Sequence, residues 1–175
     1  MINQQGSPRR KFVLADGLTP ADIEHVHREA LRVLRSDIDT AHLDAYSDEA
    51  WPPAVLNSCE RALSLAHEEV ASGARSQRHD LGMGIGIDVR DDKQFEVLED
   101  LVPYTINAEG WQGNCSIFSA NDTGTSLCIA VTQEQEAALL SRLDALGVSS
   151  TALAPLPPRR RRWGALVART RGVGE

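Results

Sequence analysis

The chain has few cysteines, few aromatic residues and no long hydrophobic run. Its 175 residues include three cysteines and 5% aromatic residues, and no window approaches the roughly 18 apolar residues of a membrane-spanning helix. Cys59, Cys115 and Cys128 have no metal-like spacing, and so sparse and odd a set is typical of a reducing compartment. Only four apolar residues follow the basic residues near the N-terminus, too few for a signal sequence. We therefore expect a cytoplasmic protein without a transmembrane segment.

The sequence also lacks the motifs that usually identify an enzyme or a cofactor site. It contains no Gly-Lys-Ser/Thr phosphate loop and no Gly-x-Ser-x-Gly nucleophile motif. The glycines of LGMGIGIDV alternate with larger residues inside a predicted strand, whereas a dinucleotide site needs its glycines in the turn between a strand and a helix. We expect no cofactor and no metal, and we favour a non-catalytic protein while leaving an enzyme open.

Histidine, aspartate and cysteine side chains could bind a metal or take part in catalysis, but each set also has an explanation that involves no such function. The five histidines have no metal-binding spacing, so we interpret them as solvated or helix-surface residues. Asp88, Asp91 and Asp92 fall where a strand meets a helix, a place that suits a reactive carboxylate but equally a helix cap. Cys115 and Cys128 fall inside predicted strands, where cysteines are usually buried and inert.

The charge of the chain is divided unevenly along its length. Hydrophobic residues make up 42% and charged residues 25%, as in an ordinary globular protein. Residues 1–158 contain 12 Lys or Arg and 24 Asp or Glu, whereas residues 159–175 contain six Arg and one Glu. The acidic body, with a net charge of -12, disfavours nucleic acid and favours basic partners. Arginine outnumbers lysine 16 to 2, a bias that we interpret as high-GC, bacterial coding.

Two helices are predicted in the first 78 residues, which we assign to an N-terminal leader and helical pair. Thr19 as N-cap and Pro20 in the first turn begin a helix over roughly residues 20–35. A second helix runs from about residue 54 to 71. Its apolar stripe consists mostly of small side chains, which permit close packing against another backbone.

The hydrophobic pattern changes from helical to alternating near residue 80. The predicted strands cover residues 81–89, 114–120, 125–132 and 148–156, and the predicted helices cover residues 91–102 and 133–146. This β-α-β-β-α-β order predicts an α+β fold in which residues 79–156 form a four-stranded antiparallel ferredoxin-like sheet with two helices on one face. Whether residues 105–111 contain a further strand stays open. Residues 157–175 form a separate Pro/Arg-rich basic tail.

The two faces of the predicted sheet differ in character. The face that the two helices can cover carries Phe118, Leu127, Ile129 and Val131, and the opposite face carries Cys115, Ile117, Cys128 and Ala130. The second face continues into the glycines of the first strand and stays open unless another element packs on it. We expect the small-residue helix at 54–71 to do so, with a second subunit or a ligand as alternatives.

Candidate binding residues come from this face, from one loop and from the tail. On the face they are Gly84, Gly86, Asp88 and Cys128. In the loop NAEGWQGN they are Trp111, which could anchor a partner or simply cover the edge of a core, and Asn114. In the tail they are Arg159, Arg160, Arg161, Arg162 and Trp163, which could contact the acidic body, nucleic acid or a membrane surface.

These features predict a non-catalytic, acidic protein-binding module, such as an immunity or antitoxin-like inhibitor or a regulatory subunit. The expected partner is a protein with a basic surface, because opposite charge attracts such a partner and speeds association. A homodimer through the sheet face is a further option. Two alternatives stay open: a small enzyme or small-molecule binder that uses the open sheet face, and a nucleic-acid contact through the arginine-rich tail.

Overall fold

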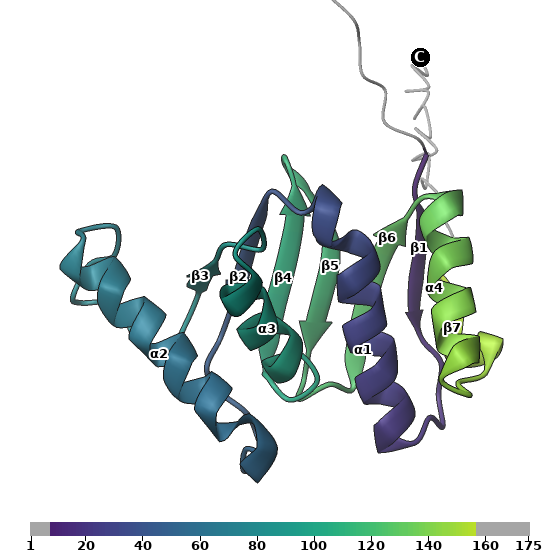
Figure 1. Cartoon of the computed structure of the whole chain (residues 1–175), viewed down its shortest axis with the longest axis horizontal. Coiled ribbons are helices and arrows are strands. Elements are labelled where there is room, and N and C mark those ends of the chain that lie inside the picture. Colours follow the sequence, from purple (N-terminus) through teal and green to yellow (C-terminus); the bar gives the residue numbers. More distant parts are fainter. Residues whose placement is uncertain (1–7, 157–175) are drawn as a thin grey trace, which may run out of the picture.

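The computed structural model of this chain describes residues 8–156 (Figure 1). The predicted tail contacts, Arg159 to Arg162 and Trp163, lie outside the described residues.

A seven-stranded sheet runs through the described residues in the order β3-β2-β4-β5-β6-β1-β7. Every neighbouring pair is antiparallel. The strands are β1 (Arg10–Leu14), β2 (Thr40–Leu43), β3 (Ile85–Ile87), β4 (Asn107–Gln112), β5 (Cys115–Asn121), β6 (Ser126–Val131) and β7 (Leu153–Pro155).

This sheet corrects the expected four-stranded ferredoxin-like fold, although the general class is α+β as predicted. β2 is inserted between β3 and β4, and β1 is inserted between β6 and β7. β4 is an additional strand that overlaps the stretch left open at 105–111. An inserted strand pairs with partners far away in the sequence, so the order of elements within residues 79–156 contains no sign of it.

The four helices lie where the periodicity predicted them. They are α1 (Pro20–Leu34), α2 (Leu56–Ala71), α3 (Asp92–Leu101) and α4 (Gln133–Ala145), with short 3₁₀ turns at Arg35–Asp37, Pro53–Val55 and Ser150–Ala152. Thr19, Asp91 and Thr132 cap α1, α3 and α4 by accepting hydrogen bonds from backbone N–H groups of the first turn. No helix within residues 8–156 is long and apolar enough to cross a membrane.

The main core lies between one face of the sheet and the layer formed by α1, α3 and α4 (Figure 1). Phe118, Leu127, Ile129 and Val131 are each 1% exposed, which confirms the face on which the sequence placed them. Ile117 is different: a β-bulge opposite Gly110 and Trp111 takes it out of register, and it is buried instead of lying on the open face.

Helix α2 does not cover the opposite face of the sheet, and this expectation was wrong. It packs beside α3 and the edge strand β3 (Figure 1), and its buried residues are Ser58, Ala62 and Ala66. The Ser58 hydroxyl donates a hydrogen bond to Asp100 on α3 at 2.6 Å. The small side chains therefore serve a close contact at the edge of the fold.

His27 on α1 lies in the core, which corrects the expectation of solvated or helix-surface histidines. Its Nδ1 is 2.8 Å from the Ile23 carbonyl oxygen, and its Nε2 has no hydrogen-bond partner among the described residues. Burial lowers the pKa of His27 to about 4, although the Ile23 and Ser126 carbonyl groups favour the charged ring. The imidazole is therefore neutral near pH 7.

Candidate functional site

The sheet face opposite α1, α3 and α4 carries mostly polar side chains in cross-strand register. One row runs from β3 to β1 through Gly86, His42, Glu109, Ser119, Cys128 and Val13. A second row contains Asn107, Asn121 and Ser126. All of these residues are at least partly exposed. No helix within residues 8–156 packs over this surface, which we call the open face.

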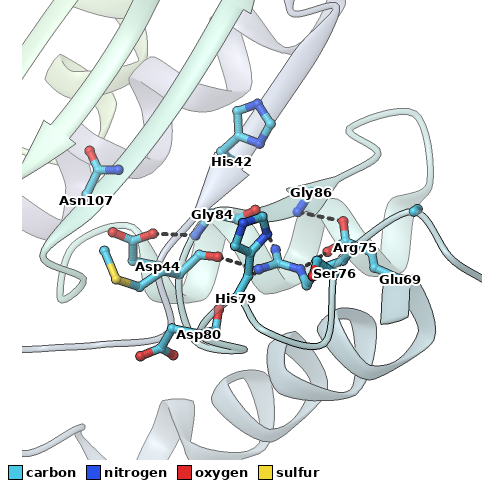
Figure 2. A pocket seen from close by; sticks show the side chains of 12 residues that line it. His42, Asp44, Glu69, Arg75, Ser76, His79, Asp80, Gly84, Gly86 and Asn107 are labelled. Atoms are coloured by element: carbon cyan, nitrogen blue, oxygen red, sulfur yellow. Dashed lines mark hydrogen bonds and ion pairs between the residues drawn. The ribbon is translucent and has the colours of Figure 1, made fainter. Parts of the chain in front are cut away.

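A cleft forms where the open face meets the C-terminal end of α2 and the loop at residues 72–84 (Figure 2). Its volume is about 730 Å³. The strands contribute His42, Gly86 and Asn107, and the wall contributes Glu69, Arg75, Ser76, His79, Asp80, Met83 and Gly84. A second hollow of about 660 Å³ adjoins it at Glu69 and Gly86 and extends to Asp39, Glu68 and Asp88. We call the two hollows together the edge cleft.

Arg75 holds the wall of the edge cleft in place. Its Nε donates a hydrogen bond to Glu69 at 2.8 Å. Its two terminal nitrogens donate to the carbonyl oxygens of Asp80, Met83 and Gly84 at 3.2, 2.7 and 2.6 Å. The Arg75 side chain is only 9% exposed. These internal contacts use most of the donors of the guanidinium group, so Arg75 fixes the loop against α2 and leaves little for a ligand.

Each of the three alternating glycines of the predicted strand has its own structural reason. A Cβ at Gly82 would lie 2.7 Å from the Tyr46 ring, and a Cβ at Gly86 would lie 2.6 Å from Glu69 Oε1. Gly84 has a φ of +60°, a backbone conformation that favours glycine. Residues 81–84 therefore form a turn and only Ile85–Ile87 is a strand, which is shorter than the strand predicted at 81–89.

Glu69 and Asp80 bind backbone groups that the short strand and the turn leave unpaired. Glu69 Oε1 accepts a hydrogen bond from the Gly86 N–H at 3.0 Å, on the edge strand of the sheet. Asp80 Oδ1 accepts from the Tyr46 hydroxyl at 2.8 Å and from the Gly82 N–H at 2.9 Å. These two donors hold the pKa of the Asp80 carboxyl below its ordinary value. The Asp80 carboxyl therefore remains anionic at neutral pH, and both acids stabilise the wall through these hydrogen bonds.

Asp44 is the buried carboxylate of the edge cleft. It directly follows β2 and is 5% exposed. Its Oδ1 accepts a hydrogen bond from the Gly84 N–H at 2.6 Å. Among residues 8–156 no other group donates a hydrogen bond to this carboxylate, and no cation forms an ion pair with it. Buried carboxylates are normally paired or fully hydrogen bonded, so Asp44 has unused acceptor capacity.

The charged side chains of the described residues that form no internal ion pair are mostly acidic. The described residues contain 12 Lys or Arg and 24 Asp or Glu. Eight of the 12 cations form ion pairs within the chain, and 16 of the 24 acids form none within residues 8–156. The edge cleft alone is lined by six acids and two arginines, namely Asp39, Asp44, Glu68, Glu69, Asp80, Asp88, Arg75 and Arg90.

The structure brings some of the predicted binding residues together and separates others. Gly84, Gly86 and Asp88 all line the edge cleft. Cys128 shares a cross-strand row with Gly86 but lies four strands away, roughly 19 Å at the usual strand spacing. Trp111 is partly exposed on β4, where it pairs with Thr40. Asn114 is exposed in the turn between β4 and β5.

Sequence reasoning missed His42, Asp44, Glu69 and Arg75 as site residues. Asp44 and its partner Gly84 are 40 residues apart, and β2 is only four residues long. The alternation in TAHL was the one available signal, but so short a run does not predict a strand by itself. The site depends on long-range pairing, which no local pattern contains.

Comparisons with known proteins identify no relative: no family model matches the chain, and no curated protein or solved structure matches it either. The geometry and charge of the molecule are therefore what indicate its function.

Proposed function

We propose that this protein is a non-catalytic binding module that recognises a protein partner with a basic surface through its open face. One observation carries the proposal. The helices α1, α3 and α4 pack on one face of a seven-stranded sheet, and no helix within residues 8–156 packs on the other. Seven strands at about 4.8 Å spacing span about 29 Å. A standard interface buries about 800 Å² on each partner, and a square patch of that area has sides of about the same length.

The charge distribution supports a basic partner. Most cations of the described residues are already engaged in internal ion pairs, so their charge adds little to the outer field. The unpaired acids attract a cationic surface at long range and accelerate its association. An immunity or antitoxin-like inhibitor, or a regulatory subunit, in the bacterial cytoplasm would fit this description. A second copy of the chain on the same face is the competing partner.

The edge cleft favours one alternative, a small enzyme or small-molecule binder. A volume of about 730 Å³ lies within the ordinary range of ligand sites. That alternative also relied on Cys128, which is four strands from Gly86. We therefore treat the edge cleft as part of a larger protein-binding surface. A nucleic-acid contact through Arg159–Arg162 concerns residues outside the described part of the chain and stays a separate hypothesis.

The test uses two charge reversals that change the net charge equally. Glu109→Lys places a cation at the centre of the open face, and Asp144→Lys places one at the exposed C-terminal end of α4. Proteins captured from a native lysate are identified, and the binding of each purified candidate is measured by calorimetry at low and physiological salt. We expect Glu109→Lys to weaken binding at least about tenfold, because like charges are then juxtaposed. Asp144→Lys should change it less than about twofold, since this site is remote from the open face.

Two results would contradict the proposal. One is a partner whose affinity falls equally in both variants, because total charge and not the open face would then govern binding. The other is self-association of the purified chain that Glu109→Lys abolishes, which would make a second copy the natural occupant of this face. Analytical ultracentrifugation of the wild-type chain and both variants distinguishes these cases.

A further inference from the structure

The edge cleft contains a buried anion without a cation. Asp44 is 5% exposed and receives one hydrogen bond, from the Gly84 N–H at 2.6 Å. Arg75, the arginine that lines the same hollow, already binds Glu69 and three backbone carbonyls. The other oxygen of the Asp44 carboxylate is not among the buried side-chain atoms without a hydrogen-bond partner, so it opens to the cleft, and a carboxylate with so little exposure to water is unfavourable without a cation. A cation with N–H donors that enters the cleft would therefore gain more at Asp44 than at an exposed acid.

The other groups that line the cleft suit a flat cation better than a spherical one. The cleft is lined by the rings of His42 and His79 and by the side-chain amide of Asn107 (Figure 2). That amide makes no hydrogen bond to another residue of the described chain. A guanidinium group presents five N–H donors in a plane and stacks on aromatic rings, whereas an ammonium group is a strongly hydrated point charge. A bound metal ion would need several convergent ligands, and residues 8–156 contain no such cluster of His, Cys, Asp and Glu.

We infer that the edge cleft binds an arginine side chain of the basic partner, with the Asp44 carboxylate as its ion-pair partner. The inference rests on the proposed function and adds the residue type that is recognised and the place where it binds. The cleft of about 730 Å³ has room for the arginine and for part of the segment that carries it. The six acids and two arginines that line both hollows give the approaching cation a favourable potential.

The test uses defined peptides and the full-length chain. Fluorescein-labelled octa-arginine and octa-lysine amides are titrated with the protein, and binding is followed by anisotropy. The wild-type chain should bind octa-arginine at least about fivefold more tightly than octa-lysine, because only the guanidinium group can form two parallel hydrogen bonds with a carboxylate. Asp44→Asn should lower the octa-arginine affinity about tenfold and remove the preference for arginine.

Asp44→Asn is informative because it changes little besides charge. The asparagine Oδ1 can still accept the hydrogen bond from Gly84, so the loop should stay in place. Asp16→Asn, in the exposed segment before α1, is the matched control with the same change in net charge and should bind as the wild type does. His42→Arg is a second, independent variant: His42 is exposed in the cleft, and a fixed positive charge there should also weaken binding of octa-arginine.

Three outcomes would overturn the inference. In the first, Asp44→Asn and His42→Arg bind octa-arginine as tightly as Asp16→Asn does. In the second, the wild-type chain does not distinguish arginine from lysine, which would indicate attraction to acidic charge alone. In the third, replacing Arg159, Arg160, Arg161 and Arg162 with glutamine tightens octa-arginine binding more than about fivefold, which would make the chain's own tail the occupant instead of a partner. A partner that responds to Glu109→Lys but not to Asp44→Asn would leave the proposed function intact and refute the arginine site.

Discussion

The two faces of the sheet use alternate residues of the same strands for opposite purposes. Phe118 and Ile129 pair across β5 and β6 on the face that α1 covers, and both are 1% exposed. Their neighbours Ser119 and Cys128 pair on the open face and remain partly exposed. Because side chains alternate along a strand, a single six- or seven-residue segment contributes both to the core and to a polar surface. The packing of the core and the character of the open face can therefore change independently in this protein.

Glycines on the two faces illustrate the same division. Gly110 lies on the covered face, where a Cβ would approach Ile38 Cδ1 at 2.9 Å and Phe118 Cβ at 3.3 Å. Gly86 lies on the open face, where a Cβ would approach the Glu69 carboxylate at 2.6 Å. The absence of a side chain at Gly110 leaves room for Ile38 in the core. The absence of one at Gly86 leaves room for Glu69, whose carboxylate accepts a hydrogen bond from the edge strand β3. The same residue type thus serves packing on one face and polar contacts on the other.

The largest expected difference between the faces is in the stability cost of truncation. Phe118→Ala should lower the free energy of unfolding by about 3–5 kcal/mol, because it opens a cavity under α1. Ser119→Ala, one residue away on the open face, should cost less than about 1 kcal/mol, since it removes one partly exposed hydroxyl. Urea denaturation of both variants measures the difference. Similar costs for the two variants would show that a further element covers the open face.

His27, which is buried beneath the covered face of the sheet, should make the stability of the protein depend on pH. The pKa of His27 is about 4 in the folded protein and 6.5 as the reference for the unfolded chain. Between these two pH values the unfolded state therefore binds more protons than the folded state does. His27 therefore opposes folding increasingly as the pH falls from 6.5 to about 4, by up to about 3 kcal/mol. His27→Leu should remove this loss of stability at low pH.

His42→Leu on the open face is the control for that experiment. Free energies of unfolding are measured by urea denaturation at intervals from pH 4 to 7, and each variant is compared with the wild type. An unchanged slope in His27→Leu would mean that the ring is hydrated in the folded protein and that its burial does not govern its titration.

Adding a methyl group at the two glycines should have a smaller effect, again larger on the covered face. Gly110→Ala must displace Ile38 within a packed core, and such overpacking typically costs about 1–3 kcal/mol. Gly86→Ala must move only the end of the flexible Glu69 side chain, at the loss of one hydrogen bond worth about 0.5–1.5 kcal/mol. Thermal unfolding ranks the two variants. Faster amide exchange at residue 86 in Gly86→Ala, with the core unchanged, would show that Glu69 protects the edge strand. A cost at Gly86 above that at Gly110 would argue against this comparison.

Local signals explain why the helices and one hairpin were predictable. Each of α1, α3 and α4 begins at a side-chain cap, and these caps are Thr19, Asp91 and Thr132. The hairpin of β5 and β6 turns at Asp122 and Thr123, which have φ angles of 55° and 54° and lie between the strands predicted at 114–120 and 125–132. The information for all of these features lies within a few residues of each of them.

The strands and the site residues that the sequence did not predict depend instead on contacts between distant segments of the chain. β1 and β2 are five and four residues long, and each becomes a strand by pairing with partners distant in the sequence. Asp44 becomes a cleft residue only because β2 enters the sheet beside β3. Gly84 and Gly86 were placed near a binding surface, but the long first strand predicted to carry them is in fact a turn and a short edge strand, bound by Arg75 and Glu69.

Four features could be inferred from the sequence alone: the helices, the α+β class, the face that the core occupies on β5 and β6, and the excess of acidic charge. Each follows from local periodicity, from capping residues or from composition. The tertiary structure decided the seven-stranded order, the position of α2 beside the sheet edge, and the convergence of Asp44, Glu69 and Arg75 on one cleft. The physical reason is that backbone pairing between strands is long-range, so which strands meet depends on the fold as a whole, and the open face exists because all three packing helices lie on the other side.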